Sequence, residues 1–461
     1  DAAHERGLRV VTDLVMNHTS DQHRWFQEAR KGPDSPYHDY YVWSETGKEY
    51  AGARIIFLDY EGSNWTYDGQ AGKYFWHRFY SSQPDLNYDN PAVHEEMLNI
   101  MRFWLDLGVD GFRADAVPYL YEREGTNCEN LPETHAFLKK VRRIMDEEYP
   151  GRVIIAEANQ WPEDVRAYFG DGDECHMCFH FPIMPRLYMA LKQADKSSIL
   201  DILARTPAIP TGAQWLTFLR NHDELTLEMV TPEERQWMWE QYAPEPRMRQ
   251  NLGIRRRLNP LLDGDKRRWL LMNALLLSLP GTPIIYYGDE IGMGDNIWLP
   301  DRHGCRTPMQ WSSAKNGGFS EADETYFPVN SDELYGHQIV NVAAQEDDLE
   351  SHLWAIRFLL RARRKQAALR LGKMDVIEVN EPAILAYWRV ADSANGEERL
   401  LCLYNLSNQQ QSLALDLATY QGRALVDLLA GDNRTIITEW PVVINLGAYA
   451  SHWYRLENSG D

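Results

Sequence analysis

The chain has 461 residues, enough for two or three domains, and 44% of them are hydrophobic, an ordinary share for a globular protein. Its net charge of −21 argues against nucleic acid as a partner and disfavours an anionic membrane surface, whereas a neutral substrate is compatible with it. No run of about 18 apolar residues predicts a transmembrane helix. Five scattered cysteines indicate a reducing compartment, so we expect a cytoplasmic protein.

Apolar strands alternate with amphipathic helices over the first 370 residues or so, and this alternation is typical of a parallel α/β barrel. We expect strands near residues 8–15, 111–114, 153–156, 175–181, 214–218 and 282–286. We expect helices near residues 92–107, 132–149, 184–192, 266–279 and 349–366.

Two long segments interrupt this alternation. Residues 18–90 are rich in Tyr, Trp, Asp and Gly, and a connection of this length usually forms a lid or a small domain. We therefore assign residues 1–17 and 91–370 to the barrel, and residues 18–90 to an inserted domain. A second insertion spans residues 225–265, and its three consecutive arginines at 255–257 predict a solvated helix face.

The pattern changes from about residue 371. Short alternating runs separated by turn residues follow at 385–390, 399–404, 412–417 and 448–455. Such runs are typical of antiparallel strands that pack as two sheets. We therefore expect a small antiparallel β-sandwich over residues 371–461.

The strand predicted at 111–114 leads into the most informative residues of the chain. Arg113 and Asp115 are two apart, so their side chains point the same way from a strand. A guanidinium beside a carboxylate keeps that carboxylate ionised, as nucleophilic attack on a sugar carbon requires. A functional residue at the carboxyl end of a barrel strand is typically catalytic. Asp115 is therefore a candidate nucleophile.

Three other predicted strands end in residues of similar chemistry. They lead into Asp13, Asn17 and His18, into Glu157, and into Asn221, His222 and Asp223. Each alone is weak evidence, because such residues commonly cap helices and turns. Glu157 suits the general acid/base of a retaining glycosidase, which needs two carboxyl groups about 5–5.5 Å apart. Burial after an apolar strand should raise the pKa of Glu157 toward neutrality.

These motifs, in this order, resemble those of the α-amylase family, glycoside hydrolase family 13. The segments that carry the resemblance are 13–18, 83–87, 111–117, Glu157 with its strand, and 221–223. A closer resemblance, to the trehalose synthases within that family, rests on segments 83–87, 117–133 and 301–311. The resemblance implies a (β/α)8 TIM barrel of which the predicted strands are the third to the eighth. The first two strands are expected to be missing from this sequence.

The resemblance also implies roles for individual residues. Asp115 would be the nucleophile, Glu157 the acid/base, and Asp223 the carboxylate that stabilises the transition state. Substrate binding would fall to His18, Gln83, Arg113 and His222. In trehalose synthases the matching positions also hold a structural calcium ion, here through Asn17, Asp85, Glu122 and the carbonyl groups of Tyr119 and Leu120. No organic cofactor is expected.

The leading hypothesis is an isomerase that interconverts maltose and trehalose through a covalent glucosyl-enzyme, with glucose as a minor product. Segments 37–43 and 298–311, rich in aromatic residues, could close over the site and keep out water. The alternative is an α-glucosidase or oligo-1,6-glucosidase that hydrolyses short α-glucosides. A non-catalytic amylase-like protein is a third hypothesis, disfavoured because all three carboxylates are present. A homo-oligomer is left open.

Overall fold

The computed structural model describes residues 1–393, 396–431 and 433–458. The chain divides into two compact units. The first consists of Asp1–Phe179 with Pro207–Gln214, and the second of His180–Thr206 with Trp215–Asp461.

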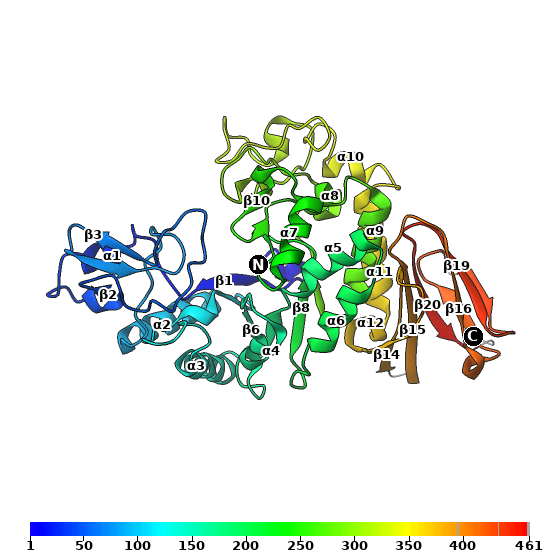
Figure 1. The fold of residues 1–461 in the computed structure, drawn as a ribbon, viewed down its shortest axis with the longest axis horizontal. Coiled ribbons are helices and arrows are strands. Elements are labelled where there is room, and N and C mark those ends of the chain that lie inside the picture. Colours follow the sequence, from blue (N-terminus) through cyan, green and yellow to red (C-terminus); the bar gives the residue numbers. More distant parts are fainter. Residues whose placement is uncertain (394–395, 432, 459–461) are drawn as a thin grey trace. The chain divides into compact units, whose positions relative to one another are not determined.

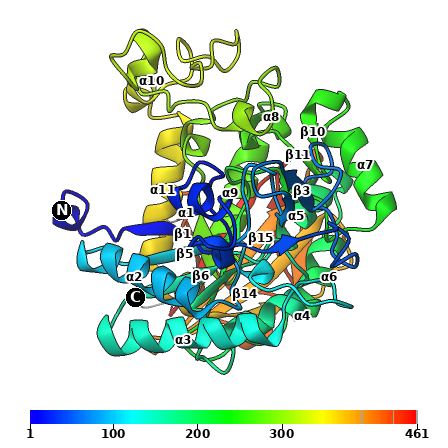
Figure 2. The ribbon, with the colours of Figure 1, turned by 90° about the vertical axis from the view of Figure 1, so that its left-hand side faces the viewer.

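Parallel strands in the order β1-β5-β6-β7 form the centre of the first unit (Figures 1 and 2). Their bounds are Val11–Val15, Gly111–Asp115, Val153–Ala156 and Met177–Phe179. Val15 is the register partner of Asp115, and Ala114 is the partner of Ala156. The carboxyl ends of β1, β5 and β6 therefore meet at one edge of the sheet. Two candidate catalytic residues lie at these ends, Asp115 in β5 and Glu157 directly after β6.

Helices α2 (Pro91–Asp106) and α3 (Pro132–Glu148) lie side by side in the first unit (Figure 1). Each begins with proline, which suits the first turn because its missing N–H would have no partner there. Two ion pairs join them, Arg102 with Glu148 at 2.8 Å and Lys140 with Glu95 at 2.9 Å. Both helices agree with the prediction to within one residue at each end. The short helix α4 (Pro162–Val165) follows β6.

The segment between β1 and α2 contains helix α1 (Arg24–Ala29) and a small antiparallel sheet in the order β2-β4-β3. These strands are Trp43–Ser44, Lys73–Trp76 and Trp65–Asp68. Aromatic rings fill the space between them. The ring centroids of Phe26 and Phe75 are 5.1 Å apart, and those of the register partners Trp65 and Trp76 are 5.0 Å apart. Much of the aromatic content of this segment is therefore structural packing.

In the second unit, β8 (Gln214–Phe218) and β12 (Thr282–Ile284) pair in parallel. The short strands β9 (Leu225–Thr226), β10 (Arg249–Gln250) and β11 (Gly253–Ile254) form an antiparallel sheet. The helices of this unit are α5 (Ile183–Gln193), α6 (Ser197–Arg205), α7 (Pro232–Tyr242), α8 (Leu258–Leu261), α9 (Lys266–Ser278), α10 (Val342–Glu346), α11 (His352–Lys365) and α12 (Ala367–Leu371).

The three consecutive arginines at 255–257 do not form a solvated helix face, so that prediction is wrong. They follow β11, and Arg257 is fully buried with its guanidinium 4.6 Å from the ring of Tyr286. Arg256 pairs with Asp295 at 3.0 Å. The groups that stabilise these charges come from residues about 30 to 40 positions later in the chain, which no local pattern could reveal.

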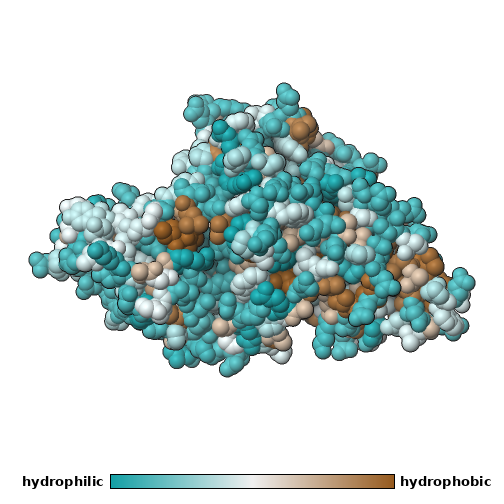
Figure 3. All heavy atoms as spheres, in the orientation of Figure 1, coloured by the Kyte–Doolittle hydropathy of each residue, from teal (hydrophilic) through white to brown (hydrophobic). Residues whose placement is uncertain are grey.

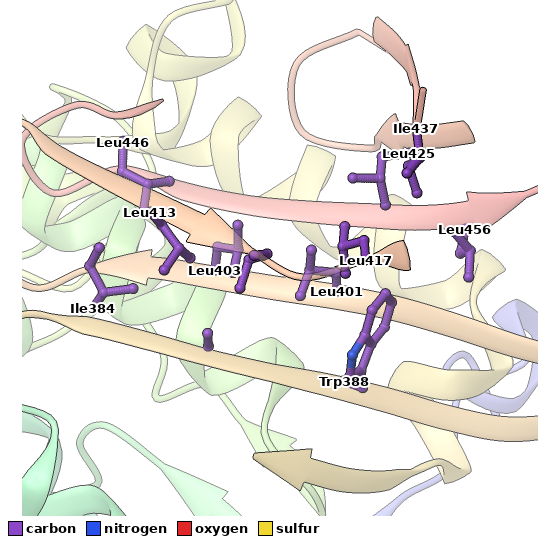
Figure 4. Packing of buried hydrophobic residues seen from close by; sticks show 12 residues of the cluster. Ile384, Trp388, Leu401, Leu403, Leu413, Leu417, Leu425, Ile437, Leu446 and Leu456 are labelled. Atoms are coloured by element: carbon purple, nitrogen blue, oxygen red, sulfur yellow. The ribbon is translucent and has the colours of Figure 1, made fainter. Parts of the chain in front are cut away.

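Antiparallel strands make up the end of the chain, as predicted. One sheet has the order β13-β14-β15-β20-β17-β18 and a second pairs β16 with β19. Their bounds are Lys373–Val376, Ile384–Ser393, Gly396–Asn405, Gln411–Leu415, Ala424–Asp427, Asn433–Ile436, Val442–Leu446 and Ser451–Glu457 for β13 to β20. Leucines from both sheets, including Leu403 and Leu413, pack with Trp388 into one core (Figure 4).

The face of the molecule drawn in Figure 3 is mainly hydrophilic, in keeping with the large net negative charge. Among the described residues, no helix has both the length and the apolar character needed to cross a membrane. All five cysteines are buried with free thiols.

Candidate active site

Arg113 lies at the centre of the candidate site in the first unit. Its Nη1 is 3.0 Å from Oδ1 of Asp115 and 2.9 Å from Oδ1 of Asp13, while its Nη2 is 2.5 Å from Oε1 of Glu157. The carboxylates come from β1, the end of β5 and the residue after β6, because the parallel pairing aligns these strand ends. One guanidinium therefore brings the predicted nucleophile and the predicted acid/base together.

Three members of this cluster are partly shielded from water, since the side chains of Arg113 and Glu157 are each 14% exposed and that of Asp115 is 23% exposed, whereas the side chain of Asp13 is 59% exposed. Burial alone would lower the pKa of Arg113, but the charges of Glu157 and Asp115 raise it above its ordinary value. Arg113 is therefore a permanent cation here.

The chain turns sharply directly after Asp115. Ala116 has the left-handed conformation, with φ of 51°, although it is not glycine and is buried. Such residues carry conformational strain and concentrate at functional sites. The turn leads into the short helical segment Val117–Tyr119, so the backbone leaves the strand at the point where the candidate nucleophile is presented.

His18 and Gln83 meet in this part of the structure. Nε2 of His18 is 3.1 Å from Nε2 of Gln83, within hydrogen-bonding distance. Burial lowers the pKa of His18, and the charge of Asp115 partly opposes that shift. The backbone holds the two segments together, since Leu86 N–H donates to the carbonyl of Asn17 at 2.9 Å. His18 is therefore a half-buried, mainly neutral imidazole that is close enough to Asp115 to interact with its charge.

The predicted calcium ligands include three buried oxygens that need a partner. Oδ1 of Asn17, Oδ2 of Asp85 and Oε1 of Glu122 accept no hydrogen bond from any group in the described residues. Buried polar atoms are normally paired. The two carbonyl ligands predicted beside them belong to Tyr119 and Leu120, which are also buried. The donor set is made of hard oxygens, the type that calcium prefers.

The pKa shifts of the Asp85 and Glu122 carboxyl groups are also compatible with a calcium site. Burial raises the pKa of Asp85 to about 8, against weaker lowering by the Arg78 N–H and the Asn17 amide. Burial and the charge of Asp85 raise the pKa of Glu122 well above its usual range. A divalent cation between them would favour both ionised forms. Among the described residues no cluster of three His, Cys, Asp or Glu side chains could hold a metal, so a metal here would need amide and carbonyl oxygens besides the two carboxylates.

Asp223 and His222 lie in the second unit. Oδ1 of Asp223 is 2.9 Å from Nη1 of Arg302 and 2.5 Å from Nη2 of Arg306. Nε2 of His222 lies 3.3 Å from Oδ2 of the same carboxylate. The backbone is fixed as well, because Arg220 donates to the Asp223 carbonyl at 2.5 Å. Two arginines therefore bind the Asp223 carboxylate and fix its orientation.

The sequence reasoning missed the partners of the candidate carboxylates. Asp13 was noted only as a polar residue at a strand end, although it contacts Arg113 across β1 and β5. Arg302 and Arg306 lie in the segment 301–311 that carried the closer resemblance, but they had no role assigned. Their spacing of four residues around a glycine was the available signal, and only the folded chain shows which carboxylate they bind.

Comparison with known proteins identifies the family. The sequence family described as "Alpha amylase, catalytic domain" matches residues 1–372, and "Maltogenic Amylase, C-terminal domain" matches residues 374–453. The first match alone covers most of the chain. The chain belongs to the α-amylase family, which confirms the resemblance inferred from the motifs.

Two curated proteins and one solved structure illustrate what the chain is similar to. A trehalose synthase/amylase of Mycolicibacterium smegmatis is 56% identical over 99% of this chain and 79% of its own length. A probable α-glucosidase of Rhizobium meliloti is 31% identical over 90% of this chain and 76% of its own length. The crystal structure of a trehalulose synthase from Pseudomonas mesoacidophila has a TM-score of 0.75 at 24% identity, with 99% of this chain and 84% of that one covered. This structural match confirms the predicted fold class.

Proposed function

We propose that the chain interconverts maltose and trehalose by intramolecular transglucosylation. The observation that carries this proposal is the 56% identity, over nearly the whole chain, to a protein named trehalose synthase/amylase. The alternative, an α-glucosidase, has a relative at only 31% identity. The paired carboxylates on Arg113 support either enzyme, since both would begin with a covalent glucosyl-enzyme.

In the proposed first step the Asp115 carboxylate attacks the anomeric carbon of the non-reducing glucose of maltose. Glu157 gives a proton to the glycosidic oxygen, the C–O bond breaks, and glucose leaves while a β-glucosyl ester forms on Asp115. In the second step the anomeric hydroxyl of that glucose attacks the ester carbon, Glu157 takes the hydroxyl proton, and Asp115 leaves. Two inversions restore the α configuration, and no water is consumed.

Other residues take supporting roles in this proposal. His18, Gln83 and His222 would bind sugar hydroxyls, and Arg113 would hold the two reacting carboxylates in position. Asp223, oriented by Arg302 and Arg306, would stabilise the positive charge that develops on the sugar ring.

A calcium ion is the second part of the proposal. Asn17, Asp85, Glu122 and the carbonyl groups of Tyr119 and Leu120 would hold it, as the three buried, unpaired oxygens among them suggest. The ion would link the end of β1 to the segments at 83–87 and 117–122. Its contribution would be structural, because it would fix the loops from which His18, Gln83 and Asp115 project.

The direct test is incubation of the protein with maltose followed by chromatographic separation of trehalose and glucose. Trehalose as the main product supports an isomerase, and Asp115→Ala should abolish both products because both pass through the same ester. If glucose is the main product, or if longer glucans are cleaved efficiently, the isomerase proposal is wrong and the α-glucosidase hypothesis takes its place.

A further inference from the structure

A pocket of about 330 Å³ lies in the second unit, lined by none of the residues assigned above to catalysis or substrate binding. Its walls include Arg256, Asp295, Asn296, Trp298, Asp332 and Tyr335. This volume is at the lower end of the range for small-ligand sites. The pocket therefore suits a ligand of the size of a mono- or disaccharide.

Trp298 is an exposed aromatic residue in the lining of this pocket. Its side chain is 68% exposed, which is unusual for the largest aromatic residue. The residue is nonetheless held in place: the guanidinium of Arg247 lies 4.6 Å from its ring, and its backbone N–H donates to Oδ1 of Asn296 at 3.0 Å. An exposed and oriented indole provides a flat apolar face of the kind on which the C–H groups of a sugar stack.

The polar groups of the pocket suit a neutral ligand. Arg256 and Asp295 pair at 3.0 Å and so cancel each other's charge. Asp332 accepts the N–H groups of Leu334 and Tyr335 through Oδ1, at 2.7 and 3.1 Å, and these bonds fix the direction of its carboxylate. Asp332 leaves the lining with one carboxylate in excess, so an anionic ligand is disfavoured, whereas the hydroxyl groups of a neutral ligand can bond to the amide and carboxylate side chains.

The part of the pocket formed by Tyr335 is preformed. A Cβ atom at Gly294 would lie 2.3 Å from Cβ of Tyr335, so the tyrosine packs directly on the glycine backbone. Asn330 Nδ2 donates to the carbonyl of Asp295 at 3.4 Å and links the two segments that form the pocket. A preformed site loses less conformational entropy when it binds.

We propose that this pocket is a second saccharide-binding site, in which a neutral mono- or disaccharide stacks on Trp298. Its hydroxyl groups would bond to Asn296 and Asp332. The affinity is expected to be in the millimolar range, because one stacked ring and a few partly exposed hydrogen bonds contribute little after the losses on association.

The test is equilibrium binding of radiolabelled maltose to the full chain carrying Asp115→Ala, a background that prevents turnover. The measured quantity is the binding component that Trp298→Ala removes, so the result does not depend on whether the enzyme makes trehalose. We expect Trp298→Ala to remove one binding component while any other component keeps its Kd within about twofold. Trp298→Phe should retain the binding component that Trp298→Ala removes, but with a Kd at least threefold higher.

The matched control is Trp440→Ala, which removes another half-exposed tryptophan, in the C-terminal part of the chain. It should leave every binding component unchanged. The proposal is overturned if Trp298→Ala leaves maltose binding unaltered. It is also overturned if that variant removes all binding, since Trp298 would then serve the catalytic site as a cover rather than a separate pocket.

Discussion

Arg113 contacts three carboxylates, and changing it tests whether its charge sustains catalysis. Arg113→Met should reduce kcat/KM for maltose by about 100- to 1000-fold, the range seen when one preorganised charge-stabilising group is removed. Arg113→Lys should reduce kcat/KM by a smaller factor, because lysine keeps the positive charge but lacks the planar guanidinium that can contact two carboxylates at once. The acidic limb of the pH profile should move to higher pH in Arg113→Met, because proton loss from a carboxyl is harder without a neighbouring cation.

Steady-state kinetics between pH 4 and pH 9 provide the measurement. Arg9→Met is the matched control, since Arg9, just before β1, is also paired with a carboxylate, that of Asp110, but its side chain is 77% exposed. That variant should keep kcat/KM within about twofold of the parent, as surface ion pairs contribute little. Equal losses in both variants would mean that Arg113 acts on folding alone.

His352 at the start of α11 links stability to pH. Burial lowers its pKa to about 4, and the charge of Lys266 adds to that shift. The unfolded chain would bind a proton near pH 6.5 while the folded chain does not, so stability is complete above pH 6.5 and is lost as the pH falls toward 4. This one group accounts for a loss of ~2 kcal/mol at pH 5.

His352→Gln removes the titrating group, so it should flatten the dependence of Tm on pH between 6.5 and 5. Scanning calorimetry of both proteins at pH 8, 6.5 and 5 tests this. The value at pH 8 records any packing loss against Trp269, whose ring lies 4.8 Å from that of His352. An unchanged difference in Tm at all three values would contradict the prediction.

At the scale of elements, local patterns predicted where strands and helices occur better than where they end. The strands at 153–156 and 214–218 have their predicted bounds, because turn residues delimit them. The strand predicted at 175–181 is shorter, since β7 finds register partners in β6 only at Ile155 and Ala156. Helix α7 was missed, although its capping box of Thr231 and Glu234 was visible in the sequence.

The site shows the same division. The pairing of Arg113 with Asp115 was predictable because it depends on a separation of two residues along one strand. The contacts of Arg113 with Asp13 and of Asp223 with Arg302 join residues about 80 to 100 positions apart. Those contacts depend on strand register and loop conformation, which composition and periodicity do not specify.

Close packing of β5 against β6 makes Gly111 sensitive to substitution. A Cβ atom there would lie 2.2 Å from the carbonyl oxygen of Val153. Gly111→Ala must therefore push the strands apart, with an expected loss of about 1–3 kcal/mol of stability and reduced activity, because Arg113 and Asp115 are on the same strand. Gly69→Ala is the matched control, as no atom lies within 4 Å of its added methyl group. Thermal unfolding of the two variants should separate them clearly.

The proposed calcium ion links three segments, so its removal should destabilise the loops and lower activity. Dialysis against EGTA should lower Tm by several degrees, and added calcium should restore it, because a ligand bound only by the folded state stabilises that state. Glu122→Gln keeps the side-chain volume but removes the charge, so it should reduce the change in Tm that EGTA and added calcium produce. Glu124→Gln, in the same loop with an exposed carboxylate, should respond like the parent. A Tm that EGTA leaves unchanged would remove calcium from the proposal.

At the scale of the whole molecule, isomerisation requires that the glucose released in the first step stays bound until it attacks the ester. Water at about 55 M competes for the same carbon, so the held glucose must have a larger effective molarity than water. Maltose incubated with a large excess of ¹³C-glucose should therefore give trehalose almost free of label. An open site would exchange its glucose with the solution, and labelled trehalose would accumulate in proportion to the added glucose. Mass spectrometry of the trehalose formed at early times distinguishes the two, and extensive label would refute the intramolecular mechanism while leaving the glucosyl-enzyme on Asp115 intact.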